Sequence, residues 1–444
     1  MSYLQKCILF FEHIILTRNR RNILSLKIMR KKMWDKIRQL RRMQEIMFME
    51  YVRMFPMPNM LEMYFNMIHV EKSIWMKPRS NYFWHKVVLC TYTDSDWIEN
   101  FRMSKKTFND LCFLLRPALE PKPLLLKSRE PLSVEKQVAV ALYKLANYAE
   151  YSVVGNIFGI HKSTVKKCFF RVVNAVNNLM MKDYLQMPDT YEASEIAMNF
   201  EITSHIPQII GCIDDTHIPI LAPSESYQDF ANCNDWPSYV LQAVIDDKCR
   251  LRNICVYHPG SIHDATVLKD SSLYRNLKNI IPQGTRNIND LEIPYFIVGD
   301  SAYPLLPWLL KGYSGTVTIE QEFFNVHLNS ARVYVKMAFS HLKARWKILL
   351  KRINTNHVFV PNIISCCCIL QNFLESKNEE FFQQWLNDVL EAEIMYPQPV
   401  NVINQECDDI SGSTIRKHLT DYLCNIPLCE IPLHASVLRD DIVQ

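Results

Sequence analysis

Glycine is scarce in this chain, with nine residues in 444. None of them forms the glycine-rich loop that cradles phosphate groups, which argues against a Rossmann or P-loop enzyme and predicts no nucleotide cofactor. No stretch approaches the roughly 20 uncharged apolar residues that cross a bilayer, so we expect no membrane segment. The first residues are mildly apolar, but Glu12 and His13 interrupt them and the basic residues follow, which argues against a signal peptide.

The fourteen cysteines are too dilute for a disulfide scaffold, and they lack the Cys-x-x-Cys spacing that is typical of structural zinc. Cys366, Cys367 and Cys368 form the densest cluster. Three consecutive side chains on a predicted helix diverge, so the cluster predicts small buried thiols in a reducing compartment.

Positive charge is concentrated near the start of the chain. Residues 18–42 contain eleven Lys and Arg residues against the single Asp35, although the formal net charge of the whole chain is only +4. We expect a basic helical N-terminal arm over residues 1–74. The arm could contact nucleic acid or direct nuclear import, and an ordinary solvated helix face explains the pattern as well.

Residues 75–190 are predicted to be helical. Three helical stretches between residues 133 and 179 have the spacing of a helix-turn-helix, with a turn at residues 159–161. In that motif the first residues of the second helix meet DNA, through hydroxyls on phosphate and lysines on phosphate or base edges. The candidate DNA-binding residues are Lys162, Ser163, Thr164, Lys166 and Lys167. An ordinary three-helix bundle, in which Ser163 caps a helix, is the alternative.

Residues 206–390 contain apolar runs that predict central strands at 209–213, 239–245, 251–257 and 295–298. The first run ends in Asp214 and Asp215, and the last is followed by Asp300. If these two strands are neighbours, their carboxylates meet at one edge of the sheet, where they could hold magnesium.

Other polar positions are less decisive. Strand alternation cannot choose between Asp214 and Asp215, which point to opposite faces. Asp264 is either a further polar group near the site or a first-turn acid of a helix, and we favour the second role. Helices are expected at 332–351 and 363–390, and residues 391–444 should form a loop, a short helix at 414–423 and a tail.

Four segments, taken in order, resemble the PIF/Harbinger group of DDE transposases and their domesticated, transposase-derived nucleases. They are residues 211–218 (GCIDDTHI), 259–264 (PGSIHD), 299–304 (GDSAYP) and 339–349 (FSHLKARWKIL). The resemblance covers roughly residues 75–423. It implies an α/β (α+β) chain with an RNase H-like mixed sheet flanked by helices, preceded by the helical region.

The resemblance also implies a chemistry in which three acids gather two divalent ions, Mg²⁺ or Mn²⁺. One ion activates water or a DNA 3′-hydroxyl and the other stabilises the leaving oxygen. By motif, Asp214 and Asp300 are the first two catalytic and metal-binding acids. Asp215 departs from the glycine that the family usually has.

The third acid is missing from its expected place. The family pattern resembles Arg-Val-Val-Ile-Glu-x-x-Phe, whereas residues 332–339 are RVYVKMAF, so Lys336 stands where the glutamate belongs. One pair of unit charges ~4 Å apart is worth about 4 kcal/mol at an effective dielectric constant of ~20, and a divalent ion doubles the repulsion of a lysine. Glu320 and Glu322 could substitute, but they precede the expected helix.

Lys336 has two interpretations: a solvated surface lysine, or an ammonium that pairs with Asp214 or Asp300 in place of metal. We favour the pair. Helical periodicity places Lys336 on a continuous cationic face with Arg332, Lys343 and Lys347. The opposite, buried face should consist of Val335, Phe339, Leu342 and Trp346.

These observations predict a transposase-derived protein of the DDE endonuclease family that is catalytically weakened or silent and acts by binding DNA or a partner. An active, divalent-metal-dependent DNA endonuclease or strand transferase is the alternative. The resemblance implies DNA and a Myb/SANT-like protein as partners, and a nuclear location, with the cytoplasm as a second compartment.

Overall fold

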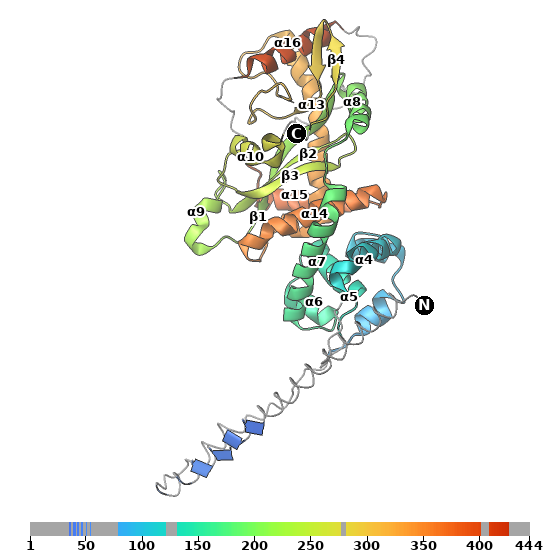
Figure 1. Cartoon of the computed structure of the whole chain (residues 1–444), viewed down its shortest axis with the longest axis vertical. Helices are drawn as coiled ribbons and strands as arrows, with labels where there is room; N and C mark the ends of the chain where they lie inside the picture. The colour runs from blue at the N-terminus through green and yellow to red at the C-terminus, as the bar shows by residue number, and fades with distance from the viewer. Residues whose placement is uncertain are drawn as a thin grey trace, which may run out of the picture. The chain divides into compact units, whose positions relative to one another are not determined.

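The computed structural model describes residues 79–120, 131–276, 281–400 and 408–425, and isolated helical positions between 35 and 54. The chain divides into two compact units, and the larger one comprises Arg79–Pro121 and Leu132–Gln444 (Figure 1). Most of the predicted basic arm lies outside the described residues, and so does the C-terminal tail.

Helices come first in this unit, as the sequence predicts. They are the π-helical turn η1 (Phe83–Val88), α3 (Asp94–Phe101), α4 (Lys105–Leu119), α5 (Val134–Asn147), α6 (Tyr151–Ile157), α7 (Lys162–Tyr184) and α8 (Thr190–Ser204). Polar N-caps start several of them. Ser104, the expected cap of α4, accepts a hydrogen bond from the backbone N–H of Thr107.

The turn between α6 and α7 depends on a glycine. Gly159 has φ of 65°, and a Cβ atom at this position would lie 2.1 Å from the carbonyl oxygen of Ser80. Only glycine fits both constraints without strain. The N-cap of α7 is His161, whose Nδ1 accepts from the N–H of Ser163, so Ser163 is not the cap that the alternative interpretation assumed.

A five-stranded mixed sheet follows, in the order β3-β2-β1-β6-β7. Its strands are β1 (Ile209–Pro219), β2 (Ser238–Ile245), β3 (Leu251–Pro259), β6 (Phe296–Val298) and β7 (Leu309–Leu310). The first three are antiparallel neighbours, whereas β6 runs parallel to β1 and β7 parallel to β6. The mixed sheet with flanking helices confirms the predicted RNase H-like α+β class. A separate hairpin joins β4 (Thr285–Ile288) to β5 (Leu291–Pro294).

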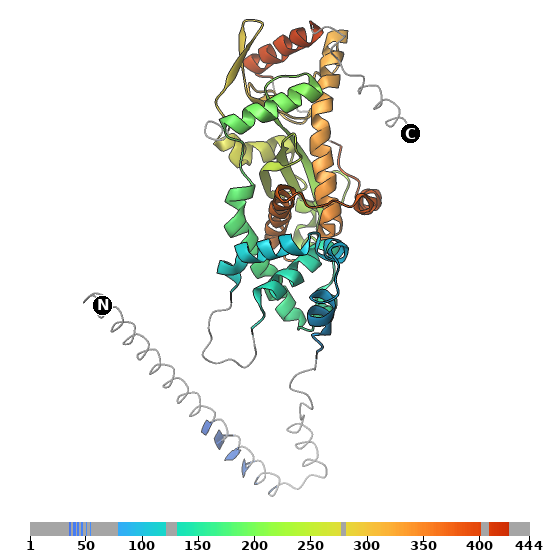
Figure 2. The same ribbon diagram turned by 90° about the vertical axis from the view of Figure 1, so that its right-hand side faces the viewer.

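The long helix α13 runs beside the sheet (Figure 2). The later helices are α10 (Asp264–Asp270), α11 (Ser272–Arg275), α13 (Ile319–Arg345), α14 (Val360–Ser376), α15 (Leu386–Met395) and α16 (Ile410–Cys424), and short turns such as α9 (Tyr227–Phe230) connect them. Two expectations were wrong in their boundaries. α13 begins well before residue 332, and the helix expected at 363–390 is interrupted between α14 and α15.

Helix α14 forms the centre of the core and packs against both α7 and β3. The amide of Asn372, on α14, donates to the carbonyl of Tyr184 at 2.6 Å, which ties the helical region to the sheet. The three consecutive cysteines of α14 are fully buried, as predicted. His357–Ser376 is long and apolar enough to cross a membrane, but 78% of its apolar window is buried inside the fold, as in the core helix of a globular protein.

Candidate functional site

Strand β1 does not end before its aspartates. It continues to Pro219, because Asp214 and Asp215 pair with Ala243 and Gln242 of β2 and the ladder stays intact. The prediction that the strand ends at residue 213 was therefore wrong. The two carboxylates lie in the interior of a central strand, on opposite faces of the sheet.

The parallel pairing of β1 with β6 brings the two predicted catalytic acids together. Cys212 pairs with Val298, the last residue of β6, and Asp214 and Asp300 follow two residues further along their segments. The two carboxylates are close enough for the charge of Asp300 to raise the pKa of Asp214. This confirms that the two acid-bearing strands are neighbours. Both aspartates are more than nine-tenths buried.

Asp214 is held by an arginine of α13. Nη2 of Arg332 donates to Oδ2 of Asp214 at 3.1 Å, and the backbone N–H of Asp215 donates to Oδ1 at 3.0 Å. Burial raises the pKa of Asp214, the guanidinium of Arg332 opposes that rise, and the charge of Asp300 adds to it. Asp214 is thus a buried carboxylate whose charge depends on one cation.

The expected pair with Lys336 is not formed with Asp214. Arg332, one helical turn earlier, makes that contact, whereas Lys336 is exposed and no ion pair joins it to a residue that the structure describes. Arg332 and Lys336 are four residues apart and share a face of the helix, but they lie at different positions along its axis. Only Arg332 lies opposite Asp214 on β1. Lys336 remains at the place where the family motif has its third acid.

The predicted cationic face of α13 is also interrupted. Lys343 is buried, and its ammonium donates to the hydroxyl of Thr216 on β1 at 2.5 Å. Burial lowers the pKa of Lys343 to about 8, and Glu393 and Asp215 partly oppose the shift. The expected apolar face is confirmed, because Val335, Phe339, Leu342 and Trp346 are all buried.

Asp215 faces the other side of the sheet. Its Oδ2 lies 3.6 Å from Nε2 of His217, and both side chains are less than a tenth exposed. Burial, and then Lys343, lower the pKa of His217 to about 4, so the ring is neutral at pH 7. The pKa of Asp215 is raised well above its usual value by burial and next by the charge of Asp264.

Asp264 is the site residue that the sequence interpretation underrated. It occupies the first turn of α10, as the favoured structural role requires, but the charges of Asp300 and Asp214 also act on it. Burial raises its pKa to about 6, the charges of Asp300 and Asp214 add to the rise, and His263 opposes it. Its position within one of the four family-like segments was the signal for a site role.

The acids do not fit the two-ion centre of a DDE enzyme. Carboxylate oxygens suit Mg²⁺ or Mn²⁺, but within the described ranges no three His, Cys, Asp or Glu side chains converge closely enough to hold an ion. The guanidinium of Arg332 already forms an ion pair with the carboxylate of Asp214. Glu320 and Glu322 are exposed on the first turn of α13, and Glu322 precedes Arg332 by a helical rise of about 15 Å, so neither replaces the third acid.

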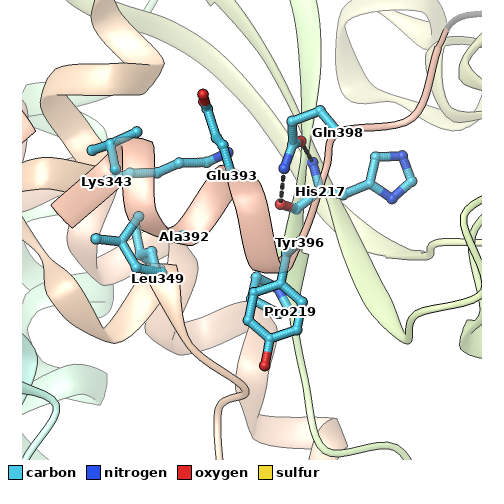
Figure 3. Close-up of a pocket in the computed structure, with 10 residues that line it drawn as sticks. His217, Pro219, Lys343, Leu349, Ala392, Glu393, Tyr396 and Gln398 are labelled. Atoms are coloured by element: carbon cyan, nitrogen blue, oxygen red, sulfur yellow. Dashed lines mark hydrogen bonds between the residues drawn. The ribbon is translucent and has the colours of Figure 1, made fainter. Parts of the chain in front are cut away.

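A side-chain amide closes the free edge of β1 beyond the acids. Oε1 of Gln398 accepts from the backbone N–H of His217 at 2.9 Å and from the hydroxyl of Thr216 at 3.0 Å. Its Nε2 donates to the carbonyl of His217 at 3.4 Å. Nearby, the side chain of Lys343 points toward Glu393 (Figure 3). The cavity that these residues line measures about 10 Å³, which is enough for one water molecule. The sequence interpretation did not identify Gln398.

The predicted DNA-binding residues share one end of α7. Lys162, Ser163, Lys166 and Lys167 are exposed and Thr164 is half-buried. The hydroxyl of Ser163 lies 2.7 Å from Nδ1 of His161. Their role in DNA binding stays a prediction.

Similarity to known proteins agrees with this geometry. A family model described as DDE superfamily endonuclease matches residues 213–372, which include all four aspartates and Lys336. The Arabidopsis thaliana protein named Protein ALP1-like is 33% identical over 353 residues, which cover 75% of this chain and 82% of that protein. This chain belongs to the Harbinger-derived DDE superfamily endonuclease family.

Other members of the family are more distant. The Arabidopsis thaliana protein named Antagonist of Like Heterochromatin Protein 1 is 31% identical over 64% of this chain and 78% of its own length. HARBI1 of Homo sapiens, which carries the name of a nuclease, is 22% identical over 65% of this chain and 79% of its own length. The helical region of this DDE family chain, residues 84–178, matches a domain of unknown function, and no solved structure matches the chain.

The ion pair between Arg332 and Asp214 predicts a stability difference along α13. Arg332→Met leaves Asp214 buried without its cation, so the free energy of unfolding should fall by about 2 to 4 kcal/mol at pH 7. Lys336→Met, one turn later on an exposed position, should change it by less than about 0.5 kcal/mol. Urea unfolding followed by circular dichroism measures both values.

Removal of the Asp214 carboxylate, which Arg332→Met leaves without a cation, provides the control. The double variant Arg332→Met, Asp214→Asn should recover part of the lost stability, since the uncompensated carboxylate is gone. Equal losses for the Arg332 and Lys336 variants would contradict the assigned pair.

Asp264 predicts a pH dependence of stability. Its pKa in the folded chain, about 6, lies above the ordinary value of 3.8, so the folded state binds more protons between these values. The contribution of Asp264 to the unfolding free energy is therefore fully present below about pH 3.8 and is lost as the pH rises through 6, by about 3 kcal/mol in total. Unfolding free energies of the wild type and of Asp264→Asn, measured from pH 4 to pH 7, should diverge in that sense. A constant difference across this range would show that Asp264 titrates normally.

Proposed function

We propose that this transposase-derived chain is domesticated and catalytically weakened or silent, and that it acts by binding DNA or a partner protein. The charge that α13 carries beside Asp214 supports this proposal. Arg332 neutralises Asp214, and Lys336 takes the place of the third acid. Two divalent cations need carboxylates around them, whereas here the helix that should complete the site contributes two cations.

A surviving metal-dependent endonuclease is the second candidate, and Asp264 favours it. This acid is buried, and its pKa responds to both Asp300 and Asp214, so the three carboxylates interact electrostatically. In such an enzyme Asp264 would replace the missing third acid. The ion pair of Arg332 with Asp214 counts against it, because a metal would have to displace the guanidinium.

DNA binding is proposed for the first turn of α7. Three exposed lysines, Lys162, Lys166 and Lys167, surround a helix N-terminus, where backbone N–H groups and the helix dipole favour phosphate. The endonuclease family and the helix-turn-helix spacing of α6 and α7 support DNA as the ligand. The basic residues 18–42 would add nonspecific phosphate contacts.

The setting that we propose is the nucleus, with the cytoplasm as a second compartment, and a Myb/SANT-like protein as a partner. One relative is named for its antagonism of a heterochromatin protein, and that name is consistent with a role near chromatin.

A nicking assay distinguishes the two candidate functions. We expect the wild type to convert supercoiled plasmid to nicked circles in Mg²⁺ or Mn²⁺ no faster than Asp214→Asn does. Lys336→Glu restores the family's third acid, and its nicking rate should exceed that of the wild type by at least about tenfold, which corresponds to about 1.4 kcal/mol of barrier.

The same assay has a clear opposite outcome. Wild-type nicking that is abolished by Asp214→Asn would refute the silent state. If Asp264→Asn abolished it too while Glu322→Gln did not, Asp264 would be the replacement acid.

Binding to duplex DNA tests the role of α7. Replacement of Lys162, Lys166 and Lys167 by alanine should weaken binding and reduce the slope of log K against log salt by up to about 2.7, because three phosphate contacts disappear. Fluorescence anisotropy between roughly 50 and 200 mM salt gives both quantities.

A matched variant removes the same charge elsewhere. Lys105, Lys106 and Lys417 are exposed on α4 and α16, and their replacement by alanine should leave the slope nearly unchanged. Equal effects of the two triple variants would show that the α7 lysines act only through the net charge of the protein, and not as a DNA-binding site.

A further inference from the structure

The helical region contains an aromatic pocket that lies apart from the acids. It has a volume of about 370 Å³, within the size range of ligand sites. Its lining includes Tyr82, Phe83, Tyr92, Asn100, Tyr143 and Asn156. They come from η1, the segment that follows it, α3, α5 and α6, so five pieces of chain converge on one hollow.

Aromatic rings line much of the pocket, and two of them meet edge to face. The rings of Phe83 and Tyr92 have centroids 6.2 Å apart and planes inclined by 86°. Tyr143 stands close enough to Tyr92 to raise its pKa, after burial has done so, to about 12. Tyr82 is 66% exposed and forms part of the rim. Four aromatic side chains thus border one hollow, and the ring surfaces that face it can attract a rounded cationic head group.

Two carboxylates of α3 lie near Tyr92 of the pocket. Asp96 and Glu99 of α3 both act on Tyr92, whose pKa they raise further. Asp96 accepts from the backbone N–H and the hydroxyl of Thr93, and these bonds lower its pKa, so it stays ionised at neutral pH. The lining side chains, which all belong to the described part of the chain, include no charged group. The ammonium of Lys136 donates a hydrogen bond to Oδ1 of Asn81, and Lys136 does not line the pocket.

We propose that this pocket binds the alkylated ammonium group of a trimethylated lysine side chain in a partner protein. Aromatic faces attract a cation through their quadrupoles, and a methylated ammonium is weakly hydrated, so it enters an apolar site more readily than free lysine. The acidic neighbours favour a cation and disfavour the phosphate backbone of a nucleic acid. The exposed rim residues Tyr82 and Asn156 leave the pocket open, which suits a side chain that projects from a polypeptide.

Three peptides that differ at one residue test the chemistry. A short Gly/Ser-rich peptide carries trimethyl-lysine, unmodified lysine, or the neutral carbon isostere of trimethyl-lysine. Isothermal titration of the full chain should give saturable binding of the trimethyl-lysine peptide. The neutral isostere should bind at least about threefold more weakly, because only the cation gains the ring attraction. Unmodified lysine should also bind more weakly.

Exposed positions allow variants that keep the fold. Tyr82→Ala and Glu99→Gln should each weaken binding of the trimethyl-lysine peptide by about twofold or more, since the first removes a wall and the second a nearby charge. Tyr191→Ala on α8 and Glu391→Gln on α15 change the same residue types on exposed sites of other helices and should leave binding unchanged.

Several outcomes would overturn the proposal. Equal affinity for the cation and its neutral isostere would show a merely apolar groove, and no saturable binding would show no site. Displacement of the peptide by a short oligothymidine, with oligonucleotide binding lost in Tyr82→Ala, would assign the rings to base stacking instead. Inhibition by tetramethylammonium that equals the affinity of the whole peptide would assign the site to a small quaternary ammonium compound.

Discussion

The register between β1 and β6 is the constraint on which the candidate site depends. Parallel pairing of Cys212 with Val298, at the end of β6, brings Asp300 close enough to Asp214 to raise its pKa. Burial makes unpaired charges at these carboxylates costly in free energy. Either neighbouring elements supply counter-charges to these carboxylates, or the carboxylates become protonated. Arg332 provides the first solution for Asp214, and the raised pKa of Asp264 is an example of the second.

Helix α13 supplies the cations, and it does so at two levels of β1. Arg332 contacts Asp214, and Lys343 donates to Thr216 further along the same strand. Gln398 closes the strand edge at the next residue. Groups of the protein itself thus contact Asp214, Thr216 and His217, whereas Oδ1 of Asp215 is buried without a hydrogen-bond partner among the described residues. The adjoining cavity has room for only a water molecule. Such a strand suits a scaffold better than an open metal site.

The sequence predicted the larger features because strong local patterns carry them. Mainly apolar, strand-like runs identified four of the five strands of the main sheet, and polar caps such as Ser104 marked helix starts. The extent of β1 was missed, since two carboxylates inside a strand contradict every local preference and only pairing with β2 keeps them there. The ion pair was assigned to Lys336 rather than Arg332 because helical periodicity shows which residues share a face of the helix. It does not show which of them lies opposite a given residue of the strand. Lys343 looked like a surface lysine, and its burial follows from tertiary packing that no local pattern records.

We propose that these acids do not form a divalent-metal site, and direct titration with Mn²⁺ tests this proposal without any substrate. Electron paramagnetic resonance of free Mn²⁺ should show that the wild type and Asp214→Asn take up the ion equally weakly, whereas Lys336→Glu gains an ion that depends on Asp214. Stoichiometric uptake of Mn²⁺ by the wild type that disappears in Asp214→Asn would contradict the claim.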